Sequence, residues 1–148
     1  MTLPELERTL DGMLGYELLE LNAQRARARL RIHDGVRQRF GMVHGGAYCA
    51  CAEMLASEAT VCCVAADGNI AMGLSNSTQF LRPASEGVIS AEGRVRRSGR
   101  TVWVWDIDFT DEQGHLCAIS RVTLAVRPAP PGGPRPLKLP TTTAGGPP

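Results

Sequence analysis

The sequence predicts an α+β fold in which an antiparallel sheet of about five to six strands wraps around one long central helix. The segment 45–66 is rich in Ala, Cys, Met and Leu, and Glu53 and Glu58 are its only charged residues. Stretches of alternating apolar and polar residues, typical of half-buried strands, stand on both sides of it. A helix that is apolar nearly all round must be covered by other structure, which the strands can supply.

The chain of 148 residues has room for one domain, placed at 1–127, with 128–148 as a tail. A composition of 43% hydrophobic and 21% charged residues is typical of globular proteins. The net charge of +1 provides no field that would gather nucleic acid, so no nucleic-acid partner is expected. The start lacks the features of a secretory signal, and the longest strictly apolar runs are six residues, whereas a membrane span needs about 20. We therefore expect a cytoplasmic protein with no membrane partner.

The cysteines point to the same compartment. They are odd in number, and none forms a Cys-x-x-Cys pair or a zinc-ligand spacing. We expect buried, reduced thiols, with no metal and no cofactor. The five are Cys49, Cys51, Cys62, Cys63 and Cys117.

The N-terminal part of the domain predicts a short helix followed by two strands. Thr2-Leu3-Pro4-Glu5 is a capping box, and leucines at helical spacing extend the helix over 2–14, to an end near Gly12 or Gly15. From 16 to 32 the pattern becomes alternating, with a turn near Asn22. Four arginines share one face of the second strand; alternation favours a solvated outer face for them over a phosphate site. They are Arg25, Arg27, Arg29 and Arg31.

The rest of the domain predicts a loop, the long helix and four strands. Residues 33–43 contain two glycines and no clear period, which indicates a loop. The helix 45–66 stops at Asp67-Gly68-Asn69, and turn signals separate the strands that follow, which we expect to form an antiparallel meander. Trp103 and Trp105 lie on the apolar face of one strand, so core packing is favoured over an acyl pocket. The expected strands are 70–81, 88–97, 101–110 and 115–127.

The segment 128–148 contains eight of the ten prolines. A segment so poor in backbone donors and apolar periodicity cannot offset its ordering entropy by burial, so we expect it to be a disordered tail. A Pro-rich docking peptide is the alternative.

The start of the long helix carries the residues that point to chemistry. Gly45 and Gly46 let a ligand approach unpaired backbone amides, which favour an oxyanion. Burial among apolar neighbours would make Glu53 a stronger base or nucleophile, and Ser57 lies one turn later on the same face. Gln38 and His44 precede the helix directly.

Helix geometry separates two of these residues. Gly45 and Glu53 are eight residues apart, about 12 Å at 1.5 Å per residue, which is too far for both to touch one reacting carbon. If they cooperate, the active site lies across a dimer interface. Taken singly, each residue has a plain structural explanation: Glu53 paired with an arginine, Gln38 on the surface, and His44 satisfied at a helix start.

Residues 10–127 resemble the hotdog-fold acyl-CoA thioesterases. The resemblance is to the branch that includes the Arthrobacter-type 4-hydroxybenzoyl-CoA thioesterase and the 1,4-dihydroxy-2-naphthoyl-CoA thioesterase. Many relatives in the phenylacetate-type branch have Asp where this chain has Glu53, so the Glu favours the first branch. It rests on the spacing of Gly41-x-x-His44-Gly45-Gly46, Glu53 and Ser57. Weaker support comes from Phe80-Leu81-Arg82-Pro83, from Gly99-Arg100-Thr101 to Trp105, and from Asp111-Glu112-x-Gly114.

The resemblance implies a function and a role for each residue. The Gly45 amide would polarise a thioester carbonyl, and Glu53 of the opposite subunit would act as nucleophile or general base. Gln38 and His44 would position the thioester and the water, and Ser57 would orient Glu53 or the water. The implied assembly is a homodimer, further paired into a homotetramer, acting on an acyl-CoA substrate.

For coenzyme A, the resemblance implies contacts to phosphate and pantetheine from Arg82 and Thr101, since guanidinium and hydroxyl donors suit phosphate oxygens. Arg100 stands before Thr101, where some relatives have Ser, and we include it among the candidate coenzyme A-binding residues. A surface charge at a strand end is the alternative for Arg82.

Two other classes of function compete with a thioesterase. One is a noncatalytic acyl-CoA sensor, since a fold alone does not fix a function. The other is a hotdog hydratase, which would need a His that works as an acid/base pair with Asp or Glu. The spacing from His44-Gly45-Gly46 to Glu53 argues against a hydratase.

Overall fold

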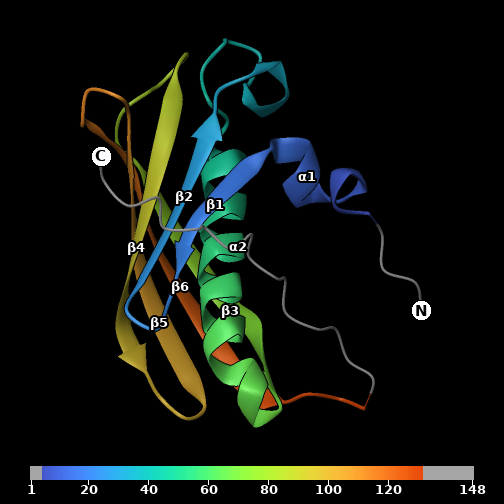
Figure 1. Ribbon diagram of the computed structural model, residues 1–148. Helices are drawn as coiled ribbons and strands as arrows, with labels where there is room; N and C mark the ends of the chain where they lie inside the picture. The colour runs from blue at the N-terminus through green and yellow to red at the C-terminus, as the bar shows by residue number, and fades with distance from the viewer. Residues whose placement is uncertain (1–4, 132–148) are drawn as a thin grey trace, which may run out of the picture.

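The computed structural model describes residues 5–131, which form one six-stranded antiparallel sheet with a long helix along one face (Figure 1). The helix α2 spans Gly45–Val64 and continues as a 3₁₀ turn, η3, at Ala65–Asp67. The sheet order is β1-β2-β4-β5-β6-β3. This is the hotdog fold that the sequence predicts. The strands are β1 Tyr16–Leu21, β2 Arg25–Arg31, β3 Asn69–Phe80, β4 Val88–Ser98, β5 Val102–Thr110 and β6 Leu116–Pro128.

The core lies between α2 and the inner face of the sheet. Leu55 of α2 and Ile107 and Phe109 of β5 are almost fully buried there. Trp105 is fully buried, and its indole N–H donates to the Thr60 hydroxyl at 3.0 Å, so the helix is tied to the middle of the sheet. The expected core role of the tryptophans is therefore confirmed.

The expected meander is wrong for its first strand. β3 does not pair with β4; it pairs along its length with β6, from Asn69 opposite Pro128 to Phe80 opposite Ala118. β4 instead pairs with β2 and β5. Strand order depends on nonlocal pairing, which alternation along the chain does not specify. As a result β3 is an edge strand, and it lies beside α2.

The N-terminal helix is shorter than expected. A 3₁₀ turn, η1 Leu6–Arg8, is followed by α1, Leu10–Leu14. Thr9 separates them because its hydroxyl donates to the Leu6 carbonyl and accepts from the Gly12 amide, which starts a new helix. Gly15 ends α1 with a φ of 72°, a conformation that favours glycine. The predicted capping box falls largely on residues 1–4, outside the described residues, and most of the predicted tail lies at 132–148, also outside them.

The outer face of the sheet carries the arginine row, and Arg25, Arg27 and Arg29 each lie in an ion pair. The Arg29 guanidinium binds Glu17 with two hydrogen bonds, of 2.6 and 3.0 Å. Arg25 pairs with Glu92 at 3.2 Å, across the β2–β4 ladder. This face is therefore a solvated network of ion pairs, as alternation predicts.

One side of α2 is covered and the other is not. By length and composition Gly45–Asp67 would also suit a membrane span, and in this fold it packs against the sheet. On the uncovered side, the exposed residues of α2 are Gly46, Glu53 and Cys62.

The expectation of buried thiols holds only in part. Cys51 and Cys117 are buried, whereas Cys62 is exposed. None of the five cysteines is in a disulfide.

Candidate active site

A tight loop brings the residues before α2 against the start of the helix. The Gln38 amide donates to the Met42 carbonyl at 2.8 Å, and the Gly41 amide donates back to the Gln38 carbonyl at 2.9 Å. Gly41 has a φ of 87°, so the turn requires glycine there. The Gln38 side-chain oxygen accepts from the Phe40 amide, which orients its NH₂ group away from that amide. The loop thus holds Gln38 rigidly beside the helix.

The first amides of α2 are not equivalent. His44 is the N-cap, and its Nδ1 accepts from the Gly46 amide at 2.8 Å. Neutral His44 therefore carries its proton on Nε2, where it can donate to a ligand. Within residues 5–131 the Gly45 amide has no hydrogen-bond acceptor. It is an available donor at the positive end of a 20-residue helix.

An aromatic ring lies against Gly45. A Cβ on residue 45 would stand 2.8 Å from Cζ of Phe80, so only glycine fits while the ring keeps this position. The ring itself is 58% exposed at the end of the edge strand β3. Phe80 thus forms one wall over the free amide.

A cavity of about 390 Å³ opens beside the Gly45 amide. Its walls come from the loop before α2, from the first turn of α2, and from the chain that follows β3. Most of the lining is apolar, as in typical small-molecule sites, and Gln38 and Arg82 add polar groups. The lining residues are Gln38, Met42, Val43, Gly45, Tyr48, Phe80, Leu81, Arg82, Pro83 and Ala84.

Glu53 and Ser57 form a second cluster. The Ser57 hydroxyl donates to Glu53 Oε1 at 3.0 Å, as their spacing predicts. The same oxygen lies over Gly73 of β3, where an added Cβ would come within 3.4 Å of it. The expected burial of Glu53 is wrong for the single chain: the side chain is exposed, because the sheet covers the opposite side of α2. Neither residue lines the cavity beside Gly45.

The candidate coenzyme A residues lie at opposite ends of the sheet. The Arg82 amide donates to the Cys117 carbonyl near the start of β6, and Arg82 lines the cavity. The Thr101 carbonyl accepts from the Val126 amide near the end of β6, and Arg100 precedes it in the exposed β4–β5 turn. Nine residues of strand separate Cys117 from Val126, about 30 Å. One protomer therefore does not bring the two ends together.

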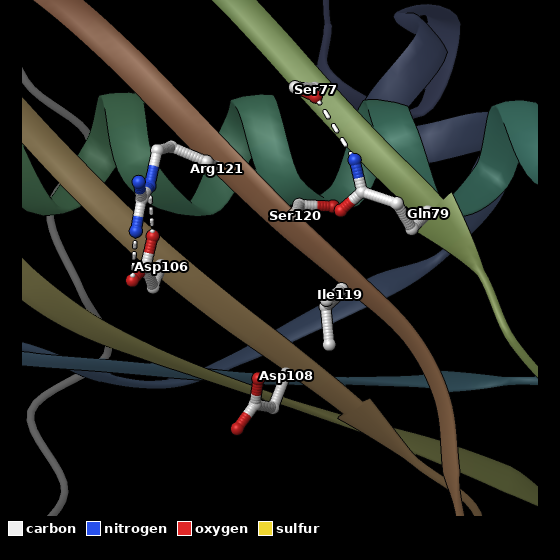
Figure 2. Close-up of a pocket in the computed structure, with 7 residues that line it drawn as sticks. All are labelled: Ser77, Gln79, Asp106, Asp108, Ile119, Ser120 and Arg121. Carbon is white, nitrogen blue, oxygen red and sulfur yellow. Dashed lines mark hydrogen bonds and ion pairs between the residues drawn. The ribbon is translucent and has the colours of Figure 1, made fainter.

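A second hollow lies on the outer face of the sheet, with α2 behind the strands (Figure 2). The Arg121 guanidinium holds Asp106 with two hydrogen bonds, of 2.6 and 2.8 Å, and Gln79 donates to Ser77 at 3.2 Å. The Arg121 pair lowers the pKa of Asp106, so this carboxylate stays ionised and paired. Asp108 also lines this hollow, and none of the described hydrogen bonds or ion pairs includes its carboxylate.

Residues 5–131 contain no group of three or more His, Cys, Asp or Glu side chains that could hold a metal ion.

Of the ten residues that line the cavity, sequence reasoning named Gln38, Gly45 and Arg82 as site residues and missed the other seven, among them Tyr48 and Phe80. Both are aromatic, and their rings lie 6.3 Å apart. Tyr48 stands in the first turn of α2, three residues after Gly45, and that spacing places it on the same side of the helix as the free amide. An aromatic residue at this position is the signal that could have revealed it.

The fold and the site together define a class: a hotdog protein whose central helix begins with a backbone amide that has no acceptor among residues 5–131 and lies beside a cavity. Comparison with known proteins identifies the family. Residues 40–118 match the thioesterase superfamily, and the chain belongs to it. It is a thioester hydrolase.

Three relatives show how far the similarity extends. The structure of a thioesterase from Haemophilus influenzae superimposes with a TM-score of 0.77 and 31% identity, over 82% of this chain and 84% of that one. A variant of a thioesterase from Pseudomonas aeruginosa gives 0.78 and 30%, over 86% and 96%. The 1,4-dihydroxy-2-naphthoyl-CoA hydrolase of Listeria monocytogenes is 31% identical over 80% of this chain and 95% of its own length.

Proposed function

We propose that this protein hydrolyses an aroyl-CoA thioester to the free acid and coenzyme A. The observation that carries the proposal is the Gly45 amide, which has no acceptor within residues 5–131, stands at the N-terminus of the central helix and lines a mostly apolar cavity. The aroyl assignment draws on Glu53 in the family motif and on the Listeria relative, whose name gives an aromatic CoA thioester as its substrate.

The proposed reaction begins when the thioester carbonyl oxygen accepts from the Gly45 amide. This hydrogen bond and the helix dipole stabilise the negative charge that develops on that oxygen as the carbonyl is attacked. The C–S bond then breaks, and the coenzyme A sulfur leaves as a thiolate that takes up a proton. Gln38 and His44 Nε2 are donors at this end of the helix that can hold the thioester or the water.

Glu53 supplies the second half of the proposed reaction. As general base it takes a proton from water while the water oxygen attacks the carbonyl; as nucleophile it forms an anhydride that water then opens. The Ser57 hydroxyl fixes one carboxylate oxygen in either case and leaves the other free to react.

We infer that Glu53 reaches the thioester from a second subunit. Three observations support this: the exposed carboxylate does not line its own chain's cavity, β3 is an unpaired edge, and β3 carries Met72 and Leu74 exposed by 47% and 61%. An exposed apolar edge strand invites pairing with another strand, and a two-fold axis makes such a contact reciprocal. Two chains joined along β3 would place their uncovered α2 surfaces side by side.

Further assembly follows the same reasoning. Arg82 and Arg100 with Thr101 lie at opposite ends of one protomer, so a single coenzyme A site that uses both ends needs residues of different subunits. We propose a homotetramer acting in the cytoplasm, with no metal and no cofactor besides the coenzyme A of the substrate.

The test is release of free thiol from a panel of CoA thioesters with aromatic, short-chain and long-chain acyl groups. We expect aroyl-CoA to be the best substrate and Glu53→Gln to lower kcat by about 10²–10⁴ with ligand affinity retained. Preference for aliphatic esters would overturn the aroyl assignment alone. Binding without turnover in the native protein would favour a sensor, and full kcat/KM in Glu53→Gln would overturn the role of Glu53.

A further inference from the structure

Asn76 joins the edge strand β3 to the central helix. Its side-chain Nδ2 donates to the Cys49 carbonyl of α2 at 2.8 Å. Among the side-chain hydrogen bonds of residues 5–131, this is the only one between β3 and α2. Asparagine is depleted in strands, so its presence inside β3 requires an explanation.

A β-bulge turns Asn76 toward the helix. The pairing of β3 with β6 shifts after Gly73, which leaves Leu74 as an extra residue. Gly73 then stands opposite Leu124 and Asn76 opposite Val122, and both of these β6 residues are fully buried in the core. Residues three apart in a regular strand face opposite sides of the sheet. Because of the bulge, Gly73 and Asn76 both face α2.

Two hydroxyl groups fix the orientation of the Asn76 amide. The Thr78 hydroxyl donates to Asn76 Oδ1 at 2.9 Å and lies 2.7 Å from the hydroxyl of Ser120, which is 4% exposed. A hydroxyl has one proton, so Ser120 is the donor to Thr78. With Oδ1 held by Thr78, Nδ2 is left to bind Cys49. The chain of hydrogen bonds therefore runs from the buried part of β6, through β3, to the helix.

The anchored carbonyl lies midway between the two candidate catalytic groups. Cys49 is four residues after Gly45 and four before Glu53, and in an α-helix its carbonyl also accepts the Glu53 amide. The Glu53 carboxylate lies over Gly73 of the same strand, β3. In a dimer joined along β3, the distance from Glu53 of one chain to Gly45 of the other depends on where each α2 lies on its own β3.

We propose that Asn76 is a positioning residue for hydrolysis. By holding the Cys49 carbonyl, it sets where α2 lies on β3, and thereby how Glu53 meets a thioester bound at the Gly45 amide of the other chain. The inference rests on the proposed thioesterase function and on the site shared across β3. A misplacement of about 1 Å costs up to about 10² in rate, so the loss of one anchor at this point matters for catalysis.

The experiment compares Asn76→Leu with Tyr16→Phe. Both variants remove one side-chain donor to a carbonyl near the start of α2, because the Tyr16 hydroxyl donates to the Ala47 carbonyl at 3.0 Å. Tyr16 lies in β1, at the opposite edge of the sheet from β3. For the best CoA ester, we expect kcat of Asn76→Leu to fall about tenfold with KM little changed, and kcat of Tyr16→Phe to stay within about twofold of native.

Thr78→Val is a second test that leaves Asn76 in place, and it carries the experiment if Asn76→Leu does not fold. Without the Thr78 hydroxyl the amide is free to rotate, so we expect a smaller fall in kcat, about threefold, again with KM little changed. Because Thr78 acts through Asn76, the double variant should be no slower than Asn76→Leu alone.

Four results would overturn the inference while leaving the thioesterase intact. They are native kcat in Asn76→Leu, native kcat in Thr78→Val, an equal loss of kcat in Tyr16→Phe, and additive losses in the double variant. Absence of turnover by the native protein on every CoA thioester would overturn the proposed function and this inference together.

Discussion

The Phe80 ring lies against Gly45 so closely that a Cβ on residue 45 would come within 2.8 Å of it. The contact explains why the free amide is presented by glycine. Because any other residue at position 45 adds a Cβ against the ring, the effect of losing the amide N–H has to be measured against a variant that adds the same Cβ.

Gly45→Ala and Gly45→Pro both add a Cβ, but only proline removes the N–H. Gly45 is the first residue of α2, where proline is tolerated, and His44 before it has a ψ of 135°, which proline accepts. We expect kcat of Gly45→Pro to fall about 10²–10³ below that of Gly45→Ala. Steady-state kinetics with the best CoA ester would check this, and equal rates for the two variants would remove the amide from the mechanism.

The Ser57 hydroxyl should matter through Glu53. Ser57→Ala removes the 3.0 Å hydrogen bond to Glu53 Oε1 and leaves the carboxylate free to rotate. We expect kcat to fall about tenfold with KM little changed, because a positioning contact worth about 1.4 kcal/mol is lost. Cys62→Ala, an exposed change further along the same helix, is the control and should keep native kcat. A native kcat in Ser57→Ala would show that the contact is only structural.

Glu58 gives a prediction about pH. Burial, and then the carboxylates of Asp11 and Glu53, raises the pKa of Glu58 above its ordinary value of 4.5. A carboxyl group with a raised folded pKa stabilises the fold below pH 4.5 and loses that contribution as the pH rises through the folded value. Glu58→Gln should therefore increase stability at pH 7 by about 0.5 kcal/mol, allowing for solvent screening of a half-buried group.

The check is the melting temperature of Glu58→Gln between pH 4 and pH 7. The gain over the native protein should shrink toward pH 4, where native Glu58 is already protonated. Glu86→Gln, at an exposed position, should show no such gain. A gain for Glu58→Gln that is equal at both ends of the range would contradict the assignment.

The bond between Trp105 and Thr60 predicts a core effect. Thr60→Val keeps the shape but leaves the buried indole N–H without its acceptor, so the free energy of unfolding should fall by about 1–3 kcal/mol. Thr60→Ser keeps the hydroxyl and should lose about 1 kcal/mol for the missing methyl group. Urea unfolding would measure both, and a smaller loss in Thr60→Val than in Thr60→Ser would contradict the importance of the bond.

Alternation and apolar content predict most of the fold, because they report which side of each element is covered. The strand containing Trp105 and the turn at Asn22, whose side chain accepts from the Gln24 and Arg25 amides, follow directly from local sequence. The edge position of β3 does not, because it depends on pairing with β6, more than 35 residues further along the chain.

The candidate site is predictable in its local parts and not in its assembly. The Glu53–Ser57 contact and the amide at Gly45 follow from helix spacing. The exposure of Glu53 does not, because an evenly apolar helix gives no indication of which side the sheet covers. Tyr48 was missed because its place in the cavity wall comes from three-dimensional packing, which the sequence does not specify.

The central claim, that one chain supplies Gly45 and its partner supplies Glu53, is tested most directly by mixing two inactive variants. Gly45→Pro and Glu53→Gln chains would be co-expressed with different tags, and the mixed dimer would be purified and assayed for thiol release. One of its two sites then has both native residues, so we predict about half the native activity per dimer. A mixed dimer as inactive as the two parent variants would contradict the claim.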